Sequence, residues 1–562
     1  MAPAMSKIAP AVLRNGIPSG GRAAASYSVA AYAIRPKTIR MPVDVFPITA
    51  TGHSAVTRTV TATRKRPISS SQFFICRTYA TSTETSNKST GSEAAKKKEG
   101  ASEDATKVKT EEATPQSTTQ ATATTDASPP AYNEAAGPPA YDWEEEGNFD
   151  IEKFADLPYT NFGVNQHIVI EKEFKECLRQ VLWQFRAPVR YAFAYGSGVF
   201  PQSKKSKDAA TEGQIKSVHP KAPLPVQKAQ NSEPKMIDFI FGVTHTQHFH
   251  SLNINQHRDH YSSLASLGSG AVSFVQDRMG AGVYFNTHVT VDGLMIKYGV
   301  VSLDTLKKDL RDWDTLYLAG RLHKPVKILR DDPQVRMANQ INLLGAVRVA
   351  LLMLPEKFTE HELYATIAGI SYLGDPRMAF PTENPRKVAN IVDHNMQNFR
   401  RLYAPLIESL PNTEFDDPAC KTFDWISTEK DRVMTIRQDM NPIKRGNMVR
   451  RLPKEFRSKL YFKYQEKFQI PQLDFDKMMS ESTNEDTGSF KRQQGGSFEQ
   501  RIAQDNPEEL RAVVRNVIRN TIKWPSTTQS LKGPLTAGFR KTFRYVGEKI
   551  GKYRQGSKEK KR

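Results

Sequence analysis

The sequence predicts an α+β protein: a domain with a mixed β-sheet, then a mainly helical domain, then a basic, amphipathic C-terminal segment. Three observations predict this class. The stretches "YAFAYGSGVF" (residues 191–200) and "MIDFIFGV" (236–243) are short apolar runs typical of buried strands. Beyond about residue 330, apolar residues recur at helical spacing. Near the C-terminus, apolar residues three or four apart are interleaved with lysines and arginines.

The N-terminal segments do not belong to the predicted fold. Residues 1–79 contain eleven Lys/Arg and a single acid, Asp44, the composition of a mitochondrial presequence. Arg77 and Tyr79 in "CRTYATST" resemble a matrix-protease cleavage site, with cleavage after Tyr79. A merely disordered basic arm is the alternative. Residues 80–140 are mostly polar and predict a disordered linker.

Charge is unevenly distributed along the chain. Of the net charge of +20, residues 1–80 carry +10 and residues 511–562 carry +13, so the body between them has a net charge of −3. A nucleic-acid binder would carry a basic body, so we expect no nucleic-acid partner. The apolar stretch "INLLGAVRVALLML" is short and contains Arg348, so it predicts a core helix rather than a membrane span.

The sheet domain is expected at residues 141–330. A helix over 174–185 precedes a strand ending at Tyr195 and the turn Gly196-Ser197, after which a short helix is expected. Residues 203–235 contain seven lysines, four prolines and no Phe, Trp or Tyr, which predicts a disordered, replaceable insertion. Strands are then expected at 236–243, 282–291 and 295–302.

Helices are predicted beyond the sheet strands at 303–319, 335–354, 360–370 and 386–404. Thr359 and Glu362 have the spacing of a capping box. The helical domain is expected at 331–410, a variable, loop-rich region at 411–505, and a basic amphipathic tail at 506–562.

The turn and the strand that follows it suggest nucleotide chemistry. Gly196 allows close approach of the backbone to a phosphate, and Ser197 adds a hydroxyl. Asp238, the lone carboxylate of its strand, could hold Mg²⁺. This is the logic of nucleotidyltransferases of the polymerase-β type. Their usual Asp-x-Asp is missing, because Ile240 occupies the second position; the sequence leaves the second ligand open among four residues, Asp292, Asp309, Asp312 and Asp375.

Eight motifs extend this pattern: "YAFAYGSGVFPQ", "MIDFIFGV", "HYSSLASLGS", "GAGVYFN", "IKYGVVS", "LYLAGRLHKPVKIL", "IAGISYLGDPR" and "LKGPLTAGFRKTFRY". Together they resemble the mitochondrial phosphatidate cytidylyltransferases, also called translocator assembly and maintenance proteins. The resemblance implies an Mg²⁺-dependent, peripheral enzyme on the matrix side of the inner membrane. It implies that CTP and phosphatidic acid are converted to CDP-diacylglycerol and pyrophosphate for phosphatidylglycerol and cardiolipin synthesis. It further implies a nucleotidyltransferase domain followed by a winged-helix-like domain.

Roles follow for the residues that match. Gly196 and Ser197 match the nucleotide-binding turn, and Asp238 matches the metal-binding, catalytic strand. Lys297, on the strand "IKYGVVS", is a catalytic candidate if its ammonium faces the cleft; a lysine reaching the surface is the alternative.

Further phosphate contacts are candidates in "GRLHKPVK" and "DHYSSL". Arg321, Lys324 and Lys327 are spaced by three and could bind substrate phosphate, or form a plain solvated face. His260 could line the cleft or only pack.

The C-terminal segment suggests docking on an anionic lipid surface. Phe539, Phe543 and Ile550 fall on one face of a helix whose other face is basic. A packed terminal helix is the alternative. The competing function is a non-catalytic, membrane-docked assembly factor for an inner-membrane translocase, and the missing second aspartate is its best support.

Overall fold

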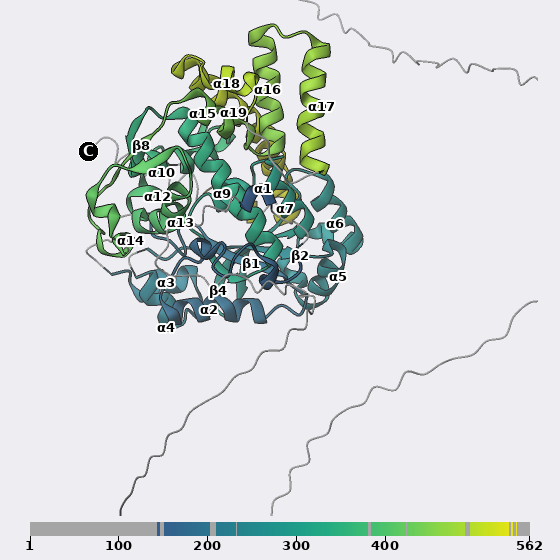
Figure 1. Cartoon of the computed structure of the whole chain (residues 1–562). Helices are drawn as coiled ribbons and strands as arrows, with labels where there is room; N and C mark the ends of the chain where they lie inside the picture. The colour runs from purple at the N-terminus through teal and green to yellow at the C-terminus, as the bar shows by residue number, and fades with distance from the viewer. Residues whose placement is uncertain are drawn as a thin grey trace, which may run out of the picture. The chain divides into compact units, whose positions relative to one another are not determined.

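The computed structural model describes residues 143–146, 151–202, 209–231, 233–379, 384–422, 424–488, 495–538, 541–542 and 547. All of them belong to one compact unit, residues 124–562 (Figure 1). The expected presequence at 1–79 and the whole of the expected linker at 80–140 lie outside the described residues.

A five-stranded mixed sheet forms the centre of the fold, with strand order β3-β4-β2-β1-β5. The strands are β1 (Tyr191–Tyr195), β2 (Ile237–Val243), β3 (Tyr284–Val291), β4 (Leu294–Ser302) and β5 (Lys327–Arg330). Neighbouring strands are antiparallel except β2 and β4, which are parallel. The predicted mixed sheet is therefore confirmed, with strand limits within a few residues of those expected.

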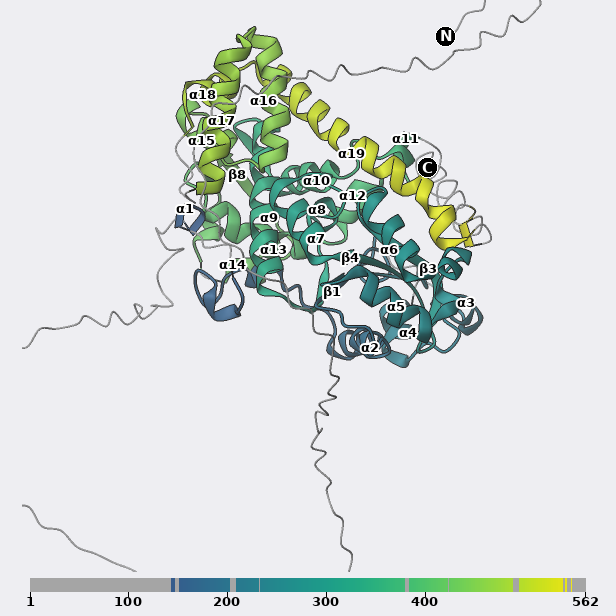
Figure 2. The ribbon, with the colours of Figure 1, turned by 90° about the vertical axis from the view of Figure 1, so that its right-hand side faces the viewer.

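Helices cover both faces of this sheet (Figure 2). On one face lie α2 (Lys172–Trp183) and α5 (Thr246–Gln256). Just after α2, the Phe185 ring packs edge-on against Phe241 and Tyr298, with 5.1 Å between ring centroids in each pair. On the other face lie α7 (Leu303–Asp312) and α9 (Pro333–Met353). A Cβ on Gly242 would lie 3.0 Å from Leu303 Cδ2, so α7 packs closely against this strand.

The predicted helices form, with shifted ends. The helix expected at 303–319 ends at Asp312 and resumes only as the short α8 (Ala319–Leu322). The capping box of Thr359 and Glu362 is present at the start of α10 (Glu360–Ile370). The helix expected at 386–404 is two helices, α12 (Lys387–Asp393) and α13 (Met396–Glu408).

Helix α9 is the core helix that the sequence predicts. Its Arg348 is buried and forms an ion pair with Glu144. Among the described residues, no helix is long and apolar enough to cross a membrane. One hydrophobic cluster extends from Ile168 to Ile522, so the sheet and the helices beyond residue 330 share a core.

Within the insertion at 203–235 the structure describes residues 209–231 and 233–235; these are folded, so the prediction of disorder is wrong for them. The insertion contains α3 (Glu212–Val218), with a capping box from Thr211, and α4 (Leu224–Ala229). Val226 is 1% exposed and belongs to the main core. The composition misled because a few isolated buried residues anchor a segment that is otherwise polar.

The region 411–505 is also more ordered than expected. Strands β6 (Lys357–Thr359), β8 (Thr435–Gln438) and β7 (Thr413–Phe415) form a second, antiparallel sheet. The helices that follow are α15 (Pro442–Arg450), α16 (Lys454–Phe468), α17 (Gln472–Gly488) and α18 (Ser497–Ala503). Buried residues of α16 such as Phe456 and Leu460 were hidden in the sequence among charged neighbours.

The last described helix is α19 (Pro507–Ala537), which crosses the molecule as the long yellow helix of Figure 2. It packs against α9, α16 and β3. The first half of the expected docking tail is therefore part of the compact unit, because Val514, Ile518 and Ile522 enter the core. Most of the amphipathic stretch after residue 538 lies outside the described residues.

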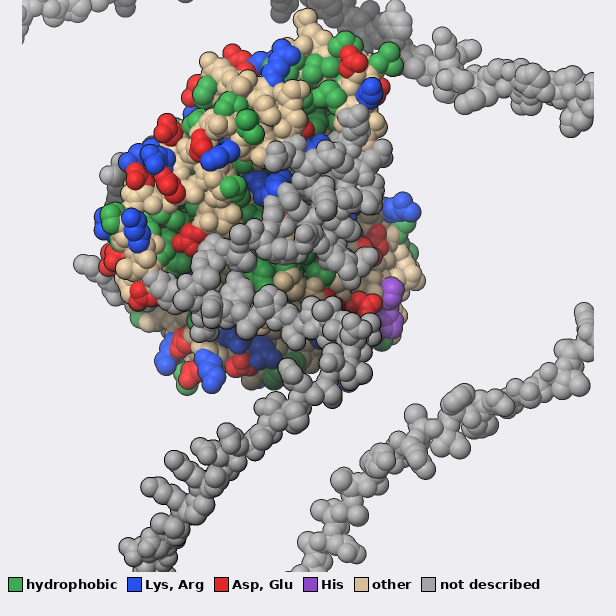
Figure 3. All heavy atoms as spheres, in the orientation of Figure 1, with side chains coloured by type: hydrophobic (Ala, Val, Ile, Leu, Met, Phe, Trp, Pro, Cys, Tyr) green, Lys and Arg blue, Asp and Glu red, His purple; other side chains and the backbone are tan. Residues whose placement is uncertain are grey.

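Acidic and basic side chains are interspersed over the described surface seen in Figure 3. This agrees with the near-neutral charge of the body.

Candidate active site

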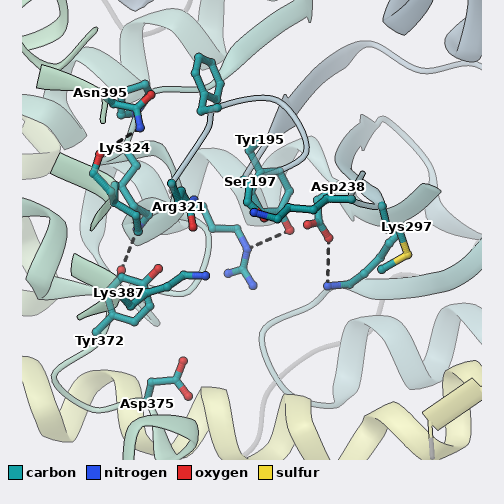
Figure 4. Close-up of a pocket in the computed structure, with 18 of the residues that line it drawn as sticks. Tyr195, Ser197, Asp238, Lys297, Arg321, Lys324, Tyr372, Asp375, Lys387 and Asn395 are labelled. Carbon is teal, nitrogen blue, oxygen red and sulfur yellow. Dashed lines mark hydrogen bonds and ion pairs between the residues drawn. The ribbon is translucent and has the colours of Figure 1, made fainter. Parts of the chain in front are cut away.

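Strand pairing brings three polar residues into one row. Asp238 and Lys297 were predicted from the sequence, and Tyr195 was not. Tyr195, the last residue of β1, is paired with Asp238 of β2. Asp238 is in turn paired with Lys297 of β4. Residues paired across neighbouring strands point to the same side of a sheet. All three side chains therefore line one cavity of about 690 Å³ (Figure 4).

Asp238 and Lys297 form the polar centre of this row. The Lys297 ammonium lies 3.3 Å from Asp238 Oδ1. It also lies 4.7 Å from the centroid of the Phe285 ring. Lys297 thus faces the cavity, as the catalytic interpretation requires, and does not reach outward to solvent.

The glycine-serine turn borders the same row. Gly196 has a left-handed φ of +79°, which favours glycine. An added Cβ there would come within 3.3 Å of Asp238 Oδ2. The amides of Val199 and Phe200 both donate to the Gly196 carbonyl, which closes the turn. Residues 197–199 form a turn and not the short helix expected, while Gly196 and Ser197 do line the cavity.

Arg321 and Lys324 reach the cavity from α8 and the residues after it. The Arg321 guanidinium stacks on Tyr317, with 4.0 Å to the ring centroid, and its Nε donates to the Tyr195 hydroxyl at 3.4 Å. Lys324 donates to the Gly320 carbonyl and, at 2.8 Å, to Ser371 Oγ. Both residues belong to the set predicted to bind phosphate.

Two other predicted residues do not line the cavity. Lys327 lies on β5, where its buried ammonium donates to the Ile168 carbonyl at 2.6 Å. The spacing of three misled because α8 ends at Leu322 and the chain is a strand by Lys327. His260 is 2% exposed and packs instead: its Nδ1 hydrogen-bonds the Tyr298 hydroxyl, and its ring stacks on His257. Burial, with His257 nearby, lowers the pKa of His260 to about 4.

The opposite wall comes from the helices beyond residue 370, and sequence reasoning missed most of it. It contains Ser371, Tyr372, Asp375, Lys387 and Asn395. Of these only Asp375 was singled out, as one possible second carboxylate. The motif "ISYLGDPR" held the signal, but nothing in it indicated that the segment folds back toward β2.

The other three carboxylates considered as a second ligand have different roles. Asp309 accepts hydrogen bonds from four backbone amides, those of Thr315, Leu316, Leu318 and Ala319. It therefore orders the loop before α8. Asp312 pairs with Arg311, and Asp292 sits in the tight turn between β3 and β4. Neither lines the cavity.

Two residues of the cavity wall adopt strained backbone conformations. His288 has φ of 50°, at a bulge in β3, and Leu316 has φ of 55° in the loop that Asp309 orders. Left-handed conformations of such residues cost about 1–3 kcal/mol and gather at functional sites. His288 is a candidate functional residue that the alternating pattern of its strand did not reveal.

The charge lining the cavity favours an anionic ligand. The cavity is lined by five basic side chains and three carboxylates. The basic ones are Lys235, Lys297, Arg321, Lys324 and Lys387, and the carboxylates are Glu233, Asp238 and Asp375. Burial, reinforced by the nearby charges of Arg321 and Lys387, lowers the pKa of Lys324 to about 7. A bound phosphate would favour the charged form of this lysine.

Asp238 fits the role of one protein ligand to a divalent cation. Mg²⁺ is usually held by one or two carboxylates together with substrate phosphates and water. Among the described residues, the one set of three side chains close enough to enclose a cation is His257, Asp259 and His260, and none of these lines the cavity. A cation at Asp238 would therefore depend on the substrate for most of its ligands.

Fold and cavity together define a class: an α+β protein with a cavity rich in basic side chains, built beside a glycine-serine turn and the carboxylate of Asp238. Comparison with known proteins is more specific. Residues 178–552 match the family model described as "Phosphatidate cytidylyltransferase, mitochondrial", and the chain belongs to this family.

Relatives of that name come from distant organisms. One from Schizosaccharomyces pombe is 35% identical over 69% of this chain and 86% of its own length. One from Saccharomyces cerevisiae is 44% identical over 46% of this chain and 62% of its own length. One from Xenopus laevis is 35% identical over 66% of this chain and 93% of its own length.

Proposed function

We propose that this protein transfers the cytidylyl group of CTP to phosphatidic acid, forming CDP-diacylglycerol and pyrophosphate. The observation that carries this proposal is the row of Tyr195, Asp238 and Lys297 beside the Gly196-Ser197 turn, in a chain whose relatives are named for this activity. Those names do not favour the non-catalytic assembly factor.

The proposal includes a finer fold assignment. The five-stranded mixed sheet with the turn after β1 supports a nucleotidyltransferase domain of the polymerase-β type over residues 141–330. The helices α10, α12 and α13 with the sheet of β6, β8 and β7 support a winged-helix-like domain. The two sheet strands β7 and β8 extend that domain beyond its expected end at residue 410.

Each group around the cavity has a role in this reaction. The Gly196-Ser197 turn holds the triphosphate of CTP through its backbone and hydroxyl. Lys297 neutralises a phosphate oxygen. Arg321, beside Tyr195, and Lys324, beside Ser371, hold phosphate groups. Asp375 and Lys387, on the helical wall, supply one negative and one positive charge near the place where the two substrates meet.

Asp238 would hold Mg²⁺, which when bound orients the triphosphate and neutralises charge on the departing pyrophosphate. Asp375 is the candidate for a second carboxylate.

The bond changes need little proton chemistry. A phosphate oxygen of phosphatidic acid attacks the α-phosphorus of CTP, and the bond from that phosphorus to the oxygen bridging the α- and β-phosphates breaks. Because the attacking oxygen is already anionic, no strong general base is required. The residues of this chain act by positioning both phosphates in line and by stabilising negative charge.

We further propose that the enzyme works as a peripheral protein on the matrix side of the mitochondrial inner membrane. The acid-poor residues 1–79 support import, and the basic stretch after residue 538 supports docking on anionic lipid. Helix α19 adds an exposed apolar stripe: Trp524 and Leu531 are 72% and 73% exposed, and Leu535 is 44% exposed. On its other face, Ile522 and Ser526 line the cavity. The helix thus lies between the proposed membrane surface and the site.

Labelled nucleotides test the proposed reaction. The protein is incubated with Mg²⁺, phosphatidate-containing vesicles and each of the four nucleoside triphosphates labelled at the α-phosphate. CTP alone should transfer label to the lipid phase, with one pyrophosphate released per lipid. Absence of lipid-linked label with CTP would contradict the proposal, and equal labelling by all four would contradict the choice of base.

A further inference from the structure

The folded insertion contacts the glycine-serine turn at Gly196–Gly198, which lies beside the row of Tyr195, Asp238 and Lys297. Gln230, just after α4, donates from Nε2 to the carbonyl of Gly198 at 2.7 Å. Gly198 is itself tightly enclosed, because an added Cβ would lie 2.7 Å from the Met236 carbonyl. A residue from the insertion thus fixes the position of the turn's third residue.

A buried histidine joins Gln230 to the strand that carries Lys297. His219 is fully buried, and its Nε2 lies 3.1 Å from Gln230 Oε1. Its Nδ1 accepts a hydrogen bond from the amide of Met295 at 3.1 Å, two residues before Lys297 on β4. Because Nδ1 is an acceptor here, Nε2 carries the proton, and the ring is neutral. Burial, its largest effect, lowers the pKa of His219 and keeps it so near neutral pH.

Further contacts hold the two helices of the insertion in place. The Lys235 amide donates to Gln230 Oε1 at 2.7 Å, and the Ala210 amide donates to the Asn231 carbonyl at 2.6 Å. The Lys221 amide donates to the Gly293 carbonyl in the β3–β4 turn. The segment is therefore docked on β4 as well as on the glycine-serine turn.

We infer that the insertion is a positioning element, in which His219 and Gln230 fix the Gly196–Gly198 turn relative to the strand of Lys297. The inference rests on the proposed function, since it assigns the turn to CTP. It replaces the expectation that residues 203–235 are a replaceable spacer. Gln230 does not line the cavity, so it acts on the nucleotide indirectly, through the turn and through the amide of Lys235, a residue that does line the cavity.

The test is Gln230→Met, which keeps the side-chain length and removes both hydrogen-bonding groups. Two partners would be left unsatisfied, the Gly198 carbonyl and the Lys235 amide. His219 Nε2 would keep its other partner, the Lys235 carbonyl, at 3.1 Å. Unmet buried groups carry penalties large enough to predict about a tenfold rise in the Kd of CTP. Because the lipid is held by other groups, the KM for phosphatidate and kcat at saturating CTP should change by less than about threefold. A purely structural role would instead weaken CTP binding, raise the KM for phosphatidate and lower kcat together.

Gln227→Met is the matched control. Gln227 lies on α4, three residues before Gln230. Its Nε2 also donates to a backbone carbonyl at 2.7 Å, but that carbonyl belongs to Ala222 within the insertion. This variant should bind CTP like the wild type. Equal CTP affinity in both variants and the wild type would overturn the inference. A wild type that does not bind CTP would contradict the proposed function, and the inference with it.

Hydrogen exchange of the wild-type protein decides the case if Gln230→Met does not fold. CTP should slow exchange of the α4 amides, although no residue of α4 lines the cavity, as well as those of Val199 and Phe200 in the turn. Protection confined to the turn would show that the insertion is not coupled to it and would overturn the inference.

Discussion

Asp238 and Lys297 occupy paired positions on the two parallel strands of the sheet, with 3.3 Å between Oδ1 and Nζ. A carboxylate and an ammonium at this distance neutralise each other while the site holds no substrate. The triphosphate and its cation would give each a new partner. Before substrate binds, the ion pair therefore keeps the two charges that the proposed reaction needs close together in the cavity.

Replacing Lys297 should impair the reaction and leave the fold intact. Lys297→Met keeps most of the length of the side chain and removes the charge that lies over Phe285. Loss of one electrostatic donor at a reacting phosphate predicts a fall in kcat/KM of about 100-fold or more. Steady-state kinetics with CTP varied measure this. Lys307→Met, on the surface of α7, serves as control; a Lys297→Met enzyme as active as that control would remove Lys297 from the mechanism.

Lys324 and Lys327 lie three residues apart and should respond differently. Lys324→Met removes a cation of the cavity and should weaken CTP or phosphatidate binding about tenfold or more. Lys327→Met breaks the bond to the Ile168 carbonyl and should cost about 1 kcal/mol of unfolding free energy, with KM unchanged. Denaturant unfolding and kinetics on both variants distinguish them. A raised KM in Lys327→Met at full stability would mean that Lys327 reaches substrate.

Nucleotide binding should take up a proton above neutral pH. In the free protein the pKa of Lys324 is about 7, so at pH 8 most molecules carry it neutral. A bound phosphate raises this pKa, because it favours the charged form. Binding should then weaken as pH rises above 7, by up to about tenfold per unit.

Calorimetry in two buffers of different ionisation enthalpy measures this uptake. It should be close to one proton at pH 8 and small at pH 6. The same titration on Lys324→Met corrects for the ionisation of CTP itself. Identical proton uptake in the two proteins would show that Lys324 does not meet phosphate.

The stripe on α19 should bind the membrane without joining the chemistry. The double substitution Trp524→Gln with Leu531→Gln removes two exposed apolar side chains, whose burial would favour binding by roughly 2 kcal/mol each at most. Co-sedimentation with anionic vesicles should fall about tenfold or more. Activity on short-chain, water-dispersed phosphatidate should persist.

A matched control for the stripe is Trp183→Gln, since Trp183 is 68% exposed on α2. That variant should bind vesicles normally. If the α19 variant also binds normally, the membrane surface lies elsewhere on the protein.

Much of the fold follows from the sequence, because β1, β2 and α9 are apolar runs and α2 carries apolar residues at helical spacing. The register in which the strands pair does not follow from the sequence. The row of Tyr195, Asp238 and Lys297 depends on which strands pair and at what offset, and such pairing joins segments more than forty residues apart. The sequence therefore predicted Asp238 and Lys297, but neither Tyr195 nor the arrangement of the row.

The helical wall and the insertion were harder to predict for different reasons. Tyr372 and Lys387 reach the cavity through packing of whole helices, which leaves no local pattern. The insertion was misjudged because its average composition is polar, while its order depends on a few buried groups such as His219 and Val226. Average composition does not report single buried hydrogen bonds.

The central claim is that the cavity beside Asp238 carries out cytidylyl transfer, and Asp238→Asn tests it most directly. The amide keeps the shape but cannot offset the charge of a bound cation. The measurement is the rate at which label from α-labelled CTP enters lipid at saturating Mg²⁺, with folding checked by circular dichroism.

Asp292→Asn is the control, because it makes the same chemical change in the β3–β4 turn, outside the cavity. We predict that Asp238→Asn lowers the rate by at least about 100-fold while Asp292→Asn retains it. A folded Asp238→Asn enzyme with a rate near that of the wild type would contradict the account.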